Sequence, residues 1–402
     1  MATEYQIKDI AKIVGGGTPK TTNEAFFGGD IPWITPKDMS SNRSKFTGSG
    51  TRNITKEGLE SCSAKMVPKG AILMSSRAPI GLLTIAENEL CTNQGIRSLI
   101  VDSSIADNEY VYYKMQILIP LIEAYSSGST FSEISGGNLG KIPIKTPSLK
   151  VQQEVAGKLR IYEQYRRNLI RTKSLIDEMI EGIFNAFFIE FLPVKDEKFR
   201  KTLSIPEGDS WNFPKALVDS EHGPIPEGWR IRRISDVMDL KYGKALKAED
   251  RIEGGDFPVY GSNGIVGYHD EKLVDGPGIV IGRKGNAGTV EWAADDFFPI
   301  DTTFYVAQEK GKNIPLEFLY FSLSTARLPW YAADTAVPGI NRNVILQLPI
   351  IIPPKSVMEQ FSSLARSVLE ISANITHRVA LLSEIEKRIA SRLIFDAEQK
   401  PN

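Results

Sequence analysis

The feature that most constrains the fold of this chain is an internal repeat. Short stretches of the first half return in the second half in the same order. The matching pairs are Ile10–Gly16 and Val237–Gly243, Gly28–Ile34 and Gly254–Tyr260, Ile72–Met74 and Ile279–Ile281, and Lys141–Ile144 and Gln347–Ile350. Arg77 and Gly81 follow the third stretch as Lys284 and Gly288 follow its counterpart. Such a repeat predicts two globular parts with a common scaffold.

Each half ends in a segment with a helical apolar pattern. Apolar residues recur at every seventh position, and these form the predicted seam: Val155, Tyr162, Leu169, Ile176, Ile183, Phe361, Val368, Ile375, Leu382 and Ile389. A sustained seven-residue repeat is typical of a coiled coil, and helices of about 40 residues form a rod of roughly 60 Å. Arg166 and Lys173 interrupt the first seam. Two separate helices on their own domains are the alternative, but mutual packing is favoured because neither stripe drifts.

The rest of each half mixes strand and helix patterns. Ile279–Ile281 and Thr302–Val306 predict strands, whereas Tyr110–Ile119 and Leu316–Leu323 predict helices. We expect an α+β fold with two similar mixed α/β domains, separated by two long antiparallel coiled-coil helices and related by a pseudo-two-fold internal repeat. The predicted segments are a first domain at 1–148, a spacer helix at 149–191, a linker and entry to the second half at 192–228, a second domain at 229–354, a second spacer helix at 355–397 and a tail at 398–402.

Composition is that of an ordinary globular protein. The 48 Lys and Arg residues nearly balance the 49 Asp and Glu residues. A nucleic acid would therefore be bound through local patches or together with a basic partner. No apolar run approaches the ~20 residues of a membrane span, and the N-terminus lacks the pattern of a signal peptide. With two cysteines, Cys62 and Cys91, we expect reduced thiols, a cytoplasmic location and no cysteine-rich zinc site.

Motifs for covalent chemistry are mostly missing. Phe46–Gly50 fits the F-x-G-x-G cofactor loop of methyltransferases, but the residues before it are polar where that loop requires a strand. No Gly-Lys pair completes a phosphate-binding loop. The three histidines are scattered, which argues against a metal site or a catalytic triad. Asp196–Lys198 offers the D-x-K of a nuclease, but a solvated charged surface is favoured there. We expect no catalytic residue, no metal and no cofactor bound by this chain.

Polar residues on glycine-rich loops are the candidates for ligand binding. Arg and Lys can contact phosphate or the O6 and N7 atoms of guanine, and Asn and Gln suit adenine. In the second half the candidates are Lys244, Tyr260, Ser262, Asn263, His269, Arg283, Lys284, Asn286, Asn341 and Arg342. In the first half they are Lys20, Lys37, Arg43, Lys45, Ser75, Ser76, Arg77, Asn93 and Gln94. The alternative is that these loops are only turns with exposed basic residues. A ligand is favoured because basic and amide side chains recur at matching places.

The chain resembles the specificity subunit of type I restriction-modification systems. The duplicated Gly-Gly-Asp-(Ile/Phe)-Pro motif carries the resemblance, together with YGSNGIVG at 260–267 and PGIVIGRKG at 277–285. CTNQG at 91–95 and GPIPEGW at 223–229 are also similar. The likeness runs from about Glu4 to the end of the second long helix. One departure is that the Pro-Glu-Gly-Trp entry of the second half has only Glu4-Tyr5 as its counterpart.

The resemblance implies two target recognition domains that each read one half of a split DNA sequence, with the long helices setting the gap. It implies a non-catalytic chain that binds double-stranded DNA, two modification subunits and restriction subunits, and no membrane. The modification subunits of this family carry S-adenosylmethionine and methylate adenine, and the restriction subunits use ATP and Mg. The isolated chain could form a homodimer.

Two alternatives remain open at this point. One is a fused or stand-alone methyltransferase or nuclease component. The other is a coiled-coil scaffold that does not contact DNA. The sequence also leaves open the bases that are recognised, the length of the gap, and the choice between a type I system and a related variant.

Overall fold

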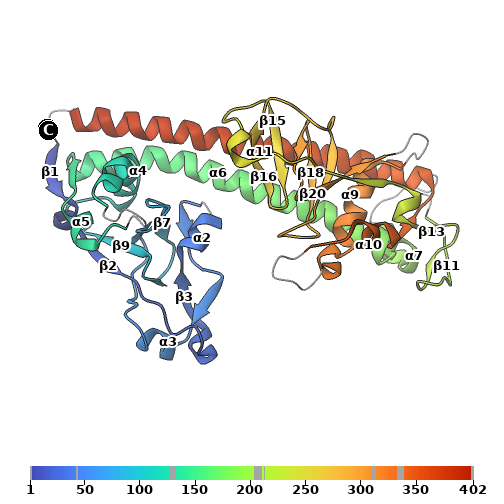
Figure 1. The fold of residues 1–402 in the computed structure, drawn as a ribbon, viewed down its shortest axis with the longest axis horizontal. Coiled ribbons are helices and arrows are strands. Elements are labelled where there is room, and N and C mark those ends of the chain that lie inside the picture. The colour runs from blue at the N-terminus through green and yellow to red at the C-terminus, as the bar shows by residue number, and fades with distance from the viewer. Residues whose placement is uncertain are drawn as a thin grey trace. The chain divides into compact units, whose positions relative to one another are not determined.

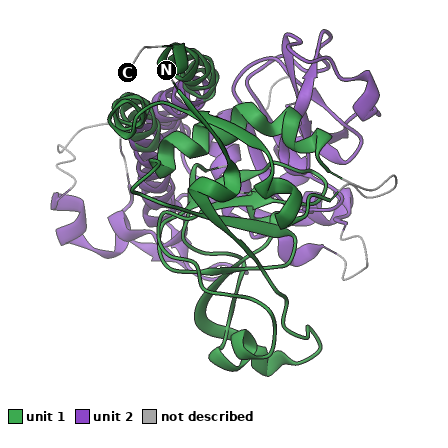
Figure 2. Ribbon diagram, turned by 90° about the vertical axis from the view of Figure 1, so that its left-hand side faces the viewer, with its two compact units in different colours: residues 1–167, 380–402 green, residues 168–379 purple. Residues whose placement is uncertain are grey.

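A computed structural model describes residues 2–41, 44–126, 133–202, 211, 213–308, 314–332 and 339–399. The chain divides into two compact units, residues 1–167 with 380–402 and residues 168–379 (Figure 2). The long helices α6 (Leu149–Phe184) and α11 (Lys355–Gln399) each contribute one part to each unit. Each unit therefore contains part of both long helices, which the sequence predicted as separate spacer segments.

Unit 1 holds the first domain. In its described part, one sheet has the strand order β2-β9-β6-β7-β4, a second has the order β5-β3-β8, and β1 pairs with β10. Its strands are β1 (Thr3–Gln6), β2 (Ala11–Gly15), β3 (Phe27–Ile34), β4 (Phe46–Thr47), β5 (Arg52–Ile54), β6 (Ile72–Ser75), β7 (Leu83–Ala86), β8 (Cys91–Thr92), β9 (Ile96–Val101) and β10 (Pro143–Thr146). Its shorter helices are α1 (Ile7–Ile10), η1 (Glu24–Phe26), α2 (Pro36–Ser41), α3 (Lys56–Glu60), α4 (Asn108–Ala124) and α5 (Gly136–Gly140).

Unit 2 holds the second domain. In its described part, the sheets have the orders β14-β20-β17-β18 and β16-β15-β19, and β13 pairs with β21 and β11 with β12. Its strands are β11 (Leu217–Val218), β12 (Ile225–Pro226), β13 (Arg230–Arg233), β14 (Asp239–Tyr242), β15 (Phe257–Gly261), β16 (Gly264–His269), β17 (Gly278–Gly282), β18 (Val290–Ala293), β19 (Phe298–Pro299), β20 (Thr303–Ala307) and β21 (Pro349–Ile352). Its shorter helices are η2 (Asn185–Ile189), α7 (Leu192–Lys195), α8 (Glu197–Thr202), η3 (Ile234–Asp236), η4 (Ala248–Asp250), α9 (Leu316–Thr325), η5 (Leu328–Tyr331) and α10 (Arg342–Gln347).

The internal repeat is confirmed by the strand order. The order β2-β9-β6-β7 in unit 1 recurs as β14-β20-β17-β18 in unit 2. The parallel pair β3 and β8 recurs as β15 and β19. Backbone hydrogen bonds repeat as well, since Gly81 N donates to Ser75 O (3.1 Å) and Gly288 N donates to Gly282 O (2.8 Å). The mixed α/β class and the predicted short helices and strands are therefore confirmed, and β4 is an addition in unit 1.

The two long helices pack on each other inside each unit, and they run antiparallel (Figure 1). In unit 1 the start of α6, with Val155 and Leu159, shares one buried cluster with Ala390 and Ile394 near the end of α11. In unit 2 the end of α6, with Phe184, shares a cluster with the start of α11. All ten predicted seam residues are buried or half-buried. In each unit the two long helices therefore pack on each other, as predicted, and do not pack separately on their own domains.

The segment predicted as a linker at 192–228 is partly folded onto unit 2. It forms α7, α8 and the β11–β12 pair. Phe213 and Ile225 are buried and join the core that contains Phe187 and Trp229. Its prolines suggested an open connection, whereas its aromatic and apolar side chains find a core in the end of α6. Across the described residues, no helix is long and apolar enough to cross a membrane.

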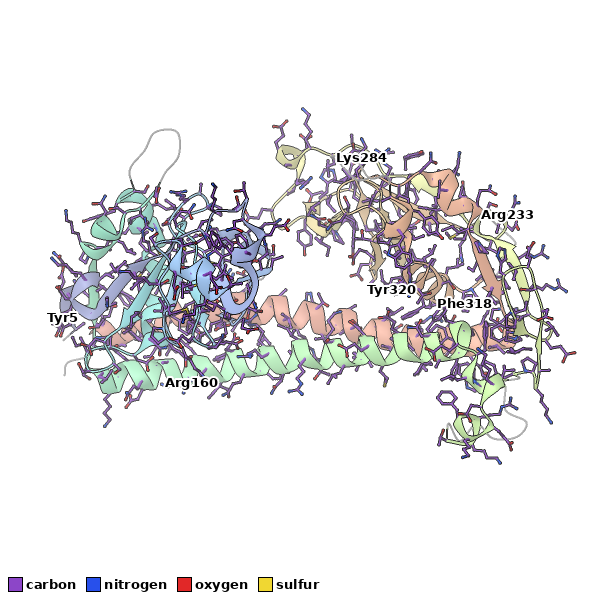
Figure 3. The ribbon with its side chains drawn as sticks, turned by 90° about the horizontal axis from the view of Figure 1, so that it is seen from below. Tyr5, Arg160, Arg233, Lys284, Phe318 and Tyr320 are labelled. Carbon is purple, nitrogen blue, oxygen red and sulfur yellow. The ribbon has the colours of Figure 1, made fainter. Side chains whose placement is uncertain are left out.

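Packed phenyl rings join the long helices to the second domain. The centroid of the Phe361 ring on α11 lies 5.3 Å from that of Phe184 on α6, and 5.4 Å from that of Phe321 on α9. The Phe318 ring is 5.6 Å from Phe184. Figure 3 shows Phe318 beside the long helices, so this cluster fastens the domain to them. Close aromatic packing adds to the free energy gained from burying apolar area.

We predict that Phe361→Ala lowers the free energy of unfolding of unit 2 by about 3–5 kcal/mol, because it removes a fully buried ring and leaves a cavity. Urea denaturation followed by circular dichroism measures this change. Leu364→Ala, on the same helix with a side chain 39% exposed, is the matched control and costs far less. Equal losses for the two variants would contradict the proposed role of the cluster.

Candidate nucleic-acid interface

The loops of the second domain that the sequence singled out come together in the structure. The turn at Ser262 follows β15, and the loop Arg283–Gly288 follows β17. The Ser262 hydroxyl donates to the carbonyl of Lys284, and the Thr289 hydroxyl donates to the carbonyl of Ser262 (3.0 Å). The two loops are thus fixed to each other by hydrogen bonds.

A third segment, Ile300–Thr302 before β20, supports the same loops. Arg283 N donates to Thr302 O (2.8 Å), and the Arg283 guanidinium donates twice to the carbonyl of Asp301 (2.7 and 3.1 Å). Arg283 also lies over the ring of Tyr242, 5.3 Å from its centroid. Ile340 N donates to Arg283 O (3.0 Å), which brings the start of α10 to this place. Five separate parts of the sequence, with Tyr242 as one of them, therefore build one surface.

Exposed polar side chains project from this surface. Lys244, Asn263, Lys284 and Asn286 are exposed, and Arg283 is half-buried. Figure 3 shows Lys284 on the side of unit 2 remote from the long helices. Gly282 must be a glycine, since a Cβ there would lie 2.3 Å from the carbonyl oxygen of Asn286. We define the second-domain loop surface as Lys244, Asn263, Arg283, Lys284 and Asn286. Its cations and amides can contact phosphate oxygens and base edges.

The other candidates of the second domain have partners within the fold. The Arg342 guanidinium donates to Leu240 O (2.6 Å) and pairs with Asp239. Tyr260 is buried against Phe297, and the half-buried His269 ring meets Phe298 edge-on at 5.6 Å. Asn341 caps α10 by accepting from Asn343 N (2.8 Å). These contacts hold the strands and the helix, so we leave these four residues out of the loop surface.

The matching loop of the first domain is built differently. Ser75 and Ser76 are completely buried, and the Ser75 hydroxyl donates to Pro79 O (2.6 Å). Arg77, which is 53% exposed, pairs with Glu133 (3.0 Å). The second oxygen of Glu133 pairs with Arg97 (3.1 Å). The matching bridge in unit 2 joins Lys284 to Gly339, which brings no carboxylate. The two domains thus present different charges at one position of the same scaffold.

The remaining first-domain candidates are spread over several loops. Lys20 and Lys37 are exposed. Gln94 is exposed and accepts a hydrogen bond from the Thr18 hydroxyl, and the half-buried Asn93 accepts from Gly95 N (2.9 Å). Arg43 lies outside the described residues. The exposed residues Lys20, Lys37, Arg77 and Gln94 are the first-domain loop surface.

Lys45 lies inside unit 1 rather than on its surface. Its side chain is 3% exposed, and its ammonium donates to Glu109 (2.8 Å) and to the Tyr113 hydroxyl (2.9 Å), both on α4. The Tyr113 hydroxyl donates in turn to Glu386 on α11, and Arg160 on α6 donates to Glu109 (2.9 Å). We leave Lys45 out of the loop surface because it links the first domain to both long helices.

Burial by itself raises the pKa of Glu109, but the charges and hydrogen bonds of Lys45 and Arg160 outweigh it and hold that pKa below its ordinary value of 4.5. The Glu109 carboxylate therefore stabilises the fold at pH values above 4.5, and this contribution is lost as the pH falls through the lowered pKa.

We predict that Glu109→Gln lowers the free energy of unfolding of unit 1 by about 1.5–3 kcal/mol at neutral pH, because Lys45 loses a charge-assisted hydrogen bond. The difference from the wild-type chain shrinks in acid, where the carboxyl of the wild type is also neutral. Urea titrations between pH 3 and pH 7, roughly the range of carboxyl titration, measure it. Glu123→Gln, at an exposed position of the same helix, is the control. A difference that does not change with pH would contradict the role of the charge.

Sequence reasoning missed several exposed aromatic residues and cation–aromatic contacts of the two domains. Tyr242, 55% exposed at the end of β14, supports the Arg283 guanidinium. In the first domain the Arg52 guanidinium lies 3.8 Å from the centroid of the Phe27 ring. Trp330 on η5 is 75% exposed. A tyrosine at a strand end or a tryptophan after a helix has no sequence signal by itself, because only the fold brings it to a loop.

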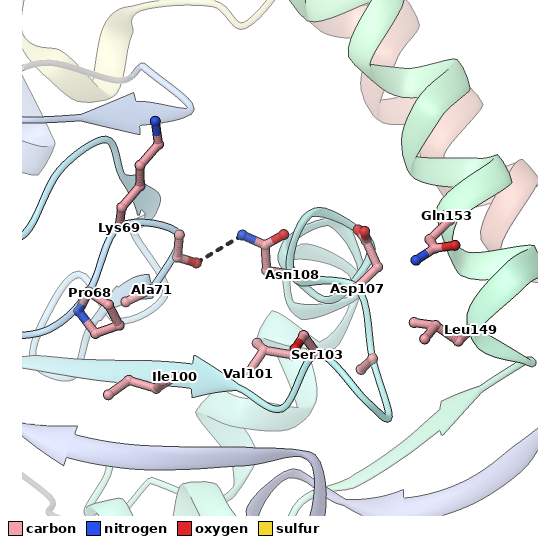
Figure 4. Close-up of a pocket in the computed structure, with 12 residues that line it drawn as sticks. Pro68, Lys69, Ala71, Ile100, Val101, Ser103, Asp107, Asn108, Leu149 and Gln153 are labelled. Atoms are coloured by element: carbon pink, nitrogen blue, oxygen red, sulfur yellow. Dashed lines mark hydrogen bonds between the residues drawn. The ribbon is translucent and has the colours of Figure 1, made fainter.

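A pocket of about 300 Å³ lies elsewhere in unit 1 (Figure 4). Lys69, Asp107, Asn108 and Gln153 line it, and the Asn108 amide donates to the carbonyl of Gly70 (3.0 Å). No predicted site residue lines this pocket. Among the described residues, no group of His, Cys, Asp and Glu side chains could hold a metal ion. Burial raises the pKa of the Cys91 thiol to about 12, so this thiol is not a nucleophile at neutral pH.

A family model described as the type I restriction modification DNA specificity domain matches residues 2–176 and 226–375, one segment in each half. The chain belongs to this family. As a type I specificity chain, it is 29% identical to the MjaIX specificity subunit of Methanocaldococcus jannaschii, with 97% of this chain and 92% of the relative covered. It is 23% identical to the EcoprrI specificity subunit of Escherichia coli, with coverage of 91% and 89%.

The fold of this specificity chain is similar to a crystal structure of the S subunit of a type I restriction-modification system from M. genitalium. The TM-score is 0.54 at 15% sequence identity, and the alignment covers 98% of this chain and 96% of the other. The resemblance inferred from the duplicated motifs is therefore confirmed, and so is the fold class.

Proposed function

We propose that this type I specificity chain reads a split DNA target, with one recognition domain for each half-site. The observation that carries the proposal is the combination of a shared scaffold and different loops. The strand orders of the two domains match, whereas Ser76 and Arg77 in one loop correspond to Arg283 and Lys284 in the other. The exposed member of each pair is Arg77 in one loop and Lys284 in the other. Two domains of one fold that differ in such loops are suited to reading two different base patterns.

The contacts to DNA come from the two loop surfaces. Lys284 and Asn286 project from a backbone that hydrogen bonds fix from three sides. Such a fixed loop loses little conformational entropy on binding, so its side chains can discriminate between bases. The near-zero net charge of the chain means that attraction to phosphate is local, and partner subunits supply further phosphate contacts.

Catalysis belongs to the partners in this proposal. The chain docks two modification subunits, which bring S-adenosylmethionine, and restriction subunits, which bring ATP and Mg. The chain itself binds no cofactor. Adenine methylation requires the target base to leave the duplex. This chain holds the duplex at the two half-sites while a modification subunit takes up the base.

Two other functions are separated from this one by direct measurements. A methyltransferase or nuclease activity of the chain itself would show as crosslinking of S-adenosylmethionine to the isolated chain or as cleavage by it. A scaffold that does not contact DNA would leave the assembled complex without preference for its target over random duplexes. The target itself is found by mapping modified bases in the host genome and searching for a split methylated motif.

We predict that Lys284→Ala weakens binding of the assembled complex to its target by about 1–3 kcal/mol if Lys284 contacts a base. The loss disappears when the second half-site of the duplex is scrambled, and assembly with the modification subunits is unchanged. Gel-shift titrations at fixed salt measure both. Lys272→Ala is the matched control, because the ammonium of Lys272 already lies between Asp275 (2.8 Å) and Asp296 (2.6 Å). Unchanged target affinity in Lys284→Ala and in Arg283→Ala would overturn the assignment of this loop.

We predict that inserting or deleting one heptad in α6 alters the preferred gap between the half-sites and leaves the bases read unchanged. The reason is that the recognition loops lie outside the helices, whereas the proposed spacing depends on helix length. Binding to duplexes with gaps of graded length measures the effect. A heptad keeps the apolar seam in phase, whereas a two-residue insertion turns the seam by about 200° and serves as the out-of-phase control. Altered base preference with an unchanged gap contradicts the proposal.

A further inference from the structure

One exposed aromatic side chain lies next to the second-domain loop surface. The Trp330 side chain is 75% exposed, more than any other large apolar side chain among the described residues. A single exposed apolar residue is common on protein surfaces and needs no ligand to explain it. The position of Trp330 and the contacts of its backbone indicate that this residue binds a ligand.

The helix η5 that carries Trp330 contacts the basic loop of the second domain. Gly288, which closes the loop Arg283–Gly288, has φ +87°, and a Cβ at this residue would lie 2.4 Å from the nitrogen of Pro329. The turn of the loop and the start of η5 are therefore packed backbone against backbone. Trp330 follows Pro329 directly, so its backbone lies one residue away from the contact with the loop that presents Asn286.

The backbone on both sides of Trp330 is held in place. Leu328 is 1% exposed and belongs to the same buried cluster as Ala287 of the loop. Pro329 restricts φ, and Trp330 N donates to Arg327 O (3.0 Å). The Arg327 guanidinium lies 4.6 Å from the centroid of the Trp330 ring. A tryptophan whose backbone is held in this way is suited to binding, because little backbone entropy is lost when it meets a ligand.

Charge indicates which ligand this is. The loop Arg283–Gly288 and the segment Arg327–Tyr331 together contain three cationic side chains, Arg283, Lys284 and Arg327, and no carboxylate. A protein partner with an apolar surface would not need these cations beside the indole. A nucleotide combines an aromatic base with a phosphate, and stacking on an indole next to cations is how proteins hold an unstacked base.

We propose that Trp330 stacks on a base of the second half-site, with Arg327 beside the adjoining phosphate. This inference rests on the proposed function, because it assumes that the loop surface faces DNA. In this proposal Trp330 binds only where a base step has opened, because a base face becomes available only when a base leaves the regular stack.

Among the described residues, the matching glycine of the first domain has a different neighbour. At the matching position in the first domain, a Cβ on Gly81 would lie 3.0 Å from the Ile119 side chain of α4. An aliphatic side chain of α4 thus lies beside Gly81 in unit 1, whereas the backbone of η5 at Leu328 and Pro329 lies beside Gly288 in unit 2. Loss of Trp330 therefore affects binding of the second half-site and leaves the first half-site unaffected.

The test uses the chain assembled with its modification subunits and a duplex that carries the mapped target. Trp330→Ala weakens binding about ten- to hundredfold, the range found when one base–aromatic stack is removed. Trp330→Phe retains most of the affinity. Scrambling the second half-site removes the difference between variant and wild type, whereas scrambling the first half-site does not. Ile371→Ala, at an exposed apolar position of α11, is the control for general loss of surface apolar area.

Tryptophan fluorescence gives a second readout. Trp33 and Trp229 are 7% and 4% exposed, and Trp211 and Trp292 are half-buried, so the quenching that belongs to Trp330 is the part that differs between the wild type and Trp330→Phe. Quenching is expected in the wild type and is lost in Trp330→Phe. Each variant is first shown to have the wild-type unfolding midpoint in urea, so that a loss of affinity is not a loss of fold.

Each outcome decides between the proposals. Unchanged affinity and quenching in the Trp330 variants, with Lys284→Ala still impaired, overturns the stacking and leaves the proposed function intact. A Trp330→Ala variant that loses assembly with the modification subunits but keeps DNA affinity shows a protein contact instead and also overturns it. If the Trp330 and Lys284 variants all bind the target like the wild type, the proposed DNA surface itself is wrong.

Discussion

The structure depends on the burial of one apolar stripe on each long helix. Neither helix is apolar enough to be buried all round, and a single helix with one apolar face has to cover that face with another element. In unit 1 the start of α6 and the end of α11 do this for each other, and in unit 2 the remaining parts do the same. Each recognition domain then packs on a surface made by two helices, so its core includes residues far away in the sequence.

The cores and the loops of the two domains have different roles. The cores hold the helices and sheets, and the loops at the ends of β6 and β17 remain free to vary. Glycines such as Gly282 and Gly288 keep the backbone path of the loop, because a Cβ would meet backbone atoms. The exposed side chains between them, those of Lys284 and Asn286, are not needed for that path. One scaffold can therefore carry Ser76 and Arg77 in one copy and Arg283 and Lys284 in the other.

The sequence was sufficient for the scaffold because periodic patterns repeat over many residues. The seam from Val155 to Ile183 and the duplicated motifs each contain several independent signs of the same structure. A single polar residue gives only one indication of its place in the structure. Ser75 and Lys45 were predicted to be loop residues. In the structure Ser75 is completely buried at the end of β6, and the buried ammonium of Lys45 pairs with Glu109 of α4. Burial of one side chain depends on which distant elements pack on it, and local sequence does not contain this information. Trp330 was missed for the same reason.

The ion pair between Arg77 and Glu133 has a consequence for how the two domains bind anions. In the first domain a phosphate has to displace a carboxylate that is already present, and Glu133 remains joined to Arg97 (3.1 Å). Binding there is an exchange of one anionic partner for another, with little net release of counterions. Among the described residues, Gly339 at the matching position brings no carboxylate to Lys284, so in the proposed complex a DNA phosphate is the first anion to pair with this cation. If each domain reads one half-site as proposed, binding to the second half-site depends more strongly on ionic strength than binding to the first.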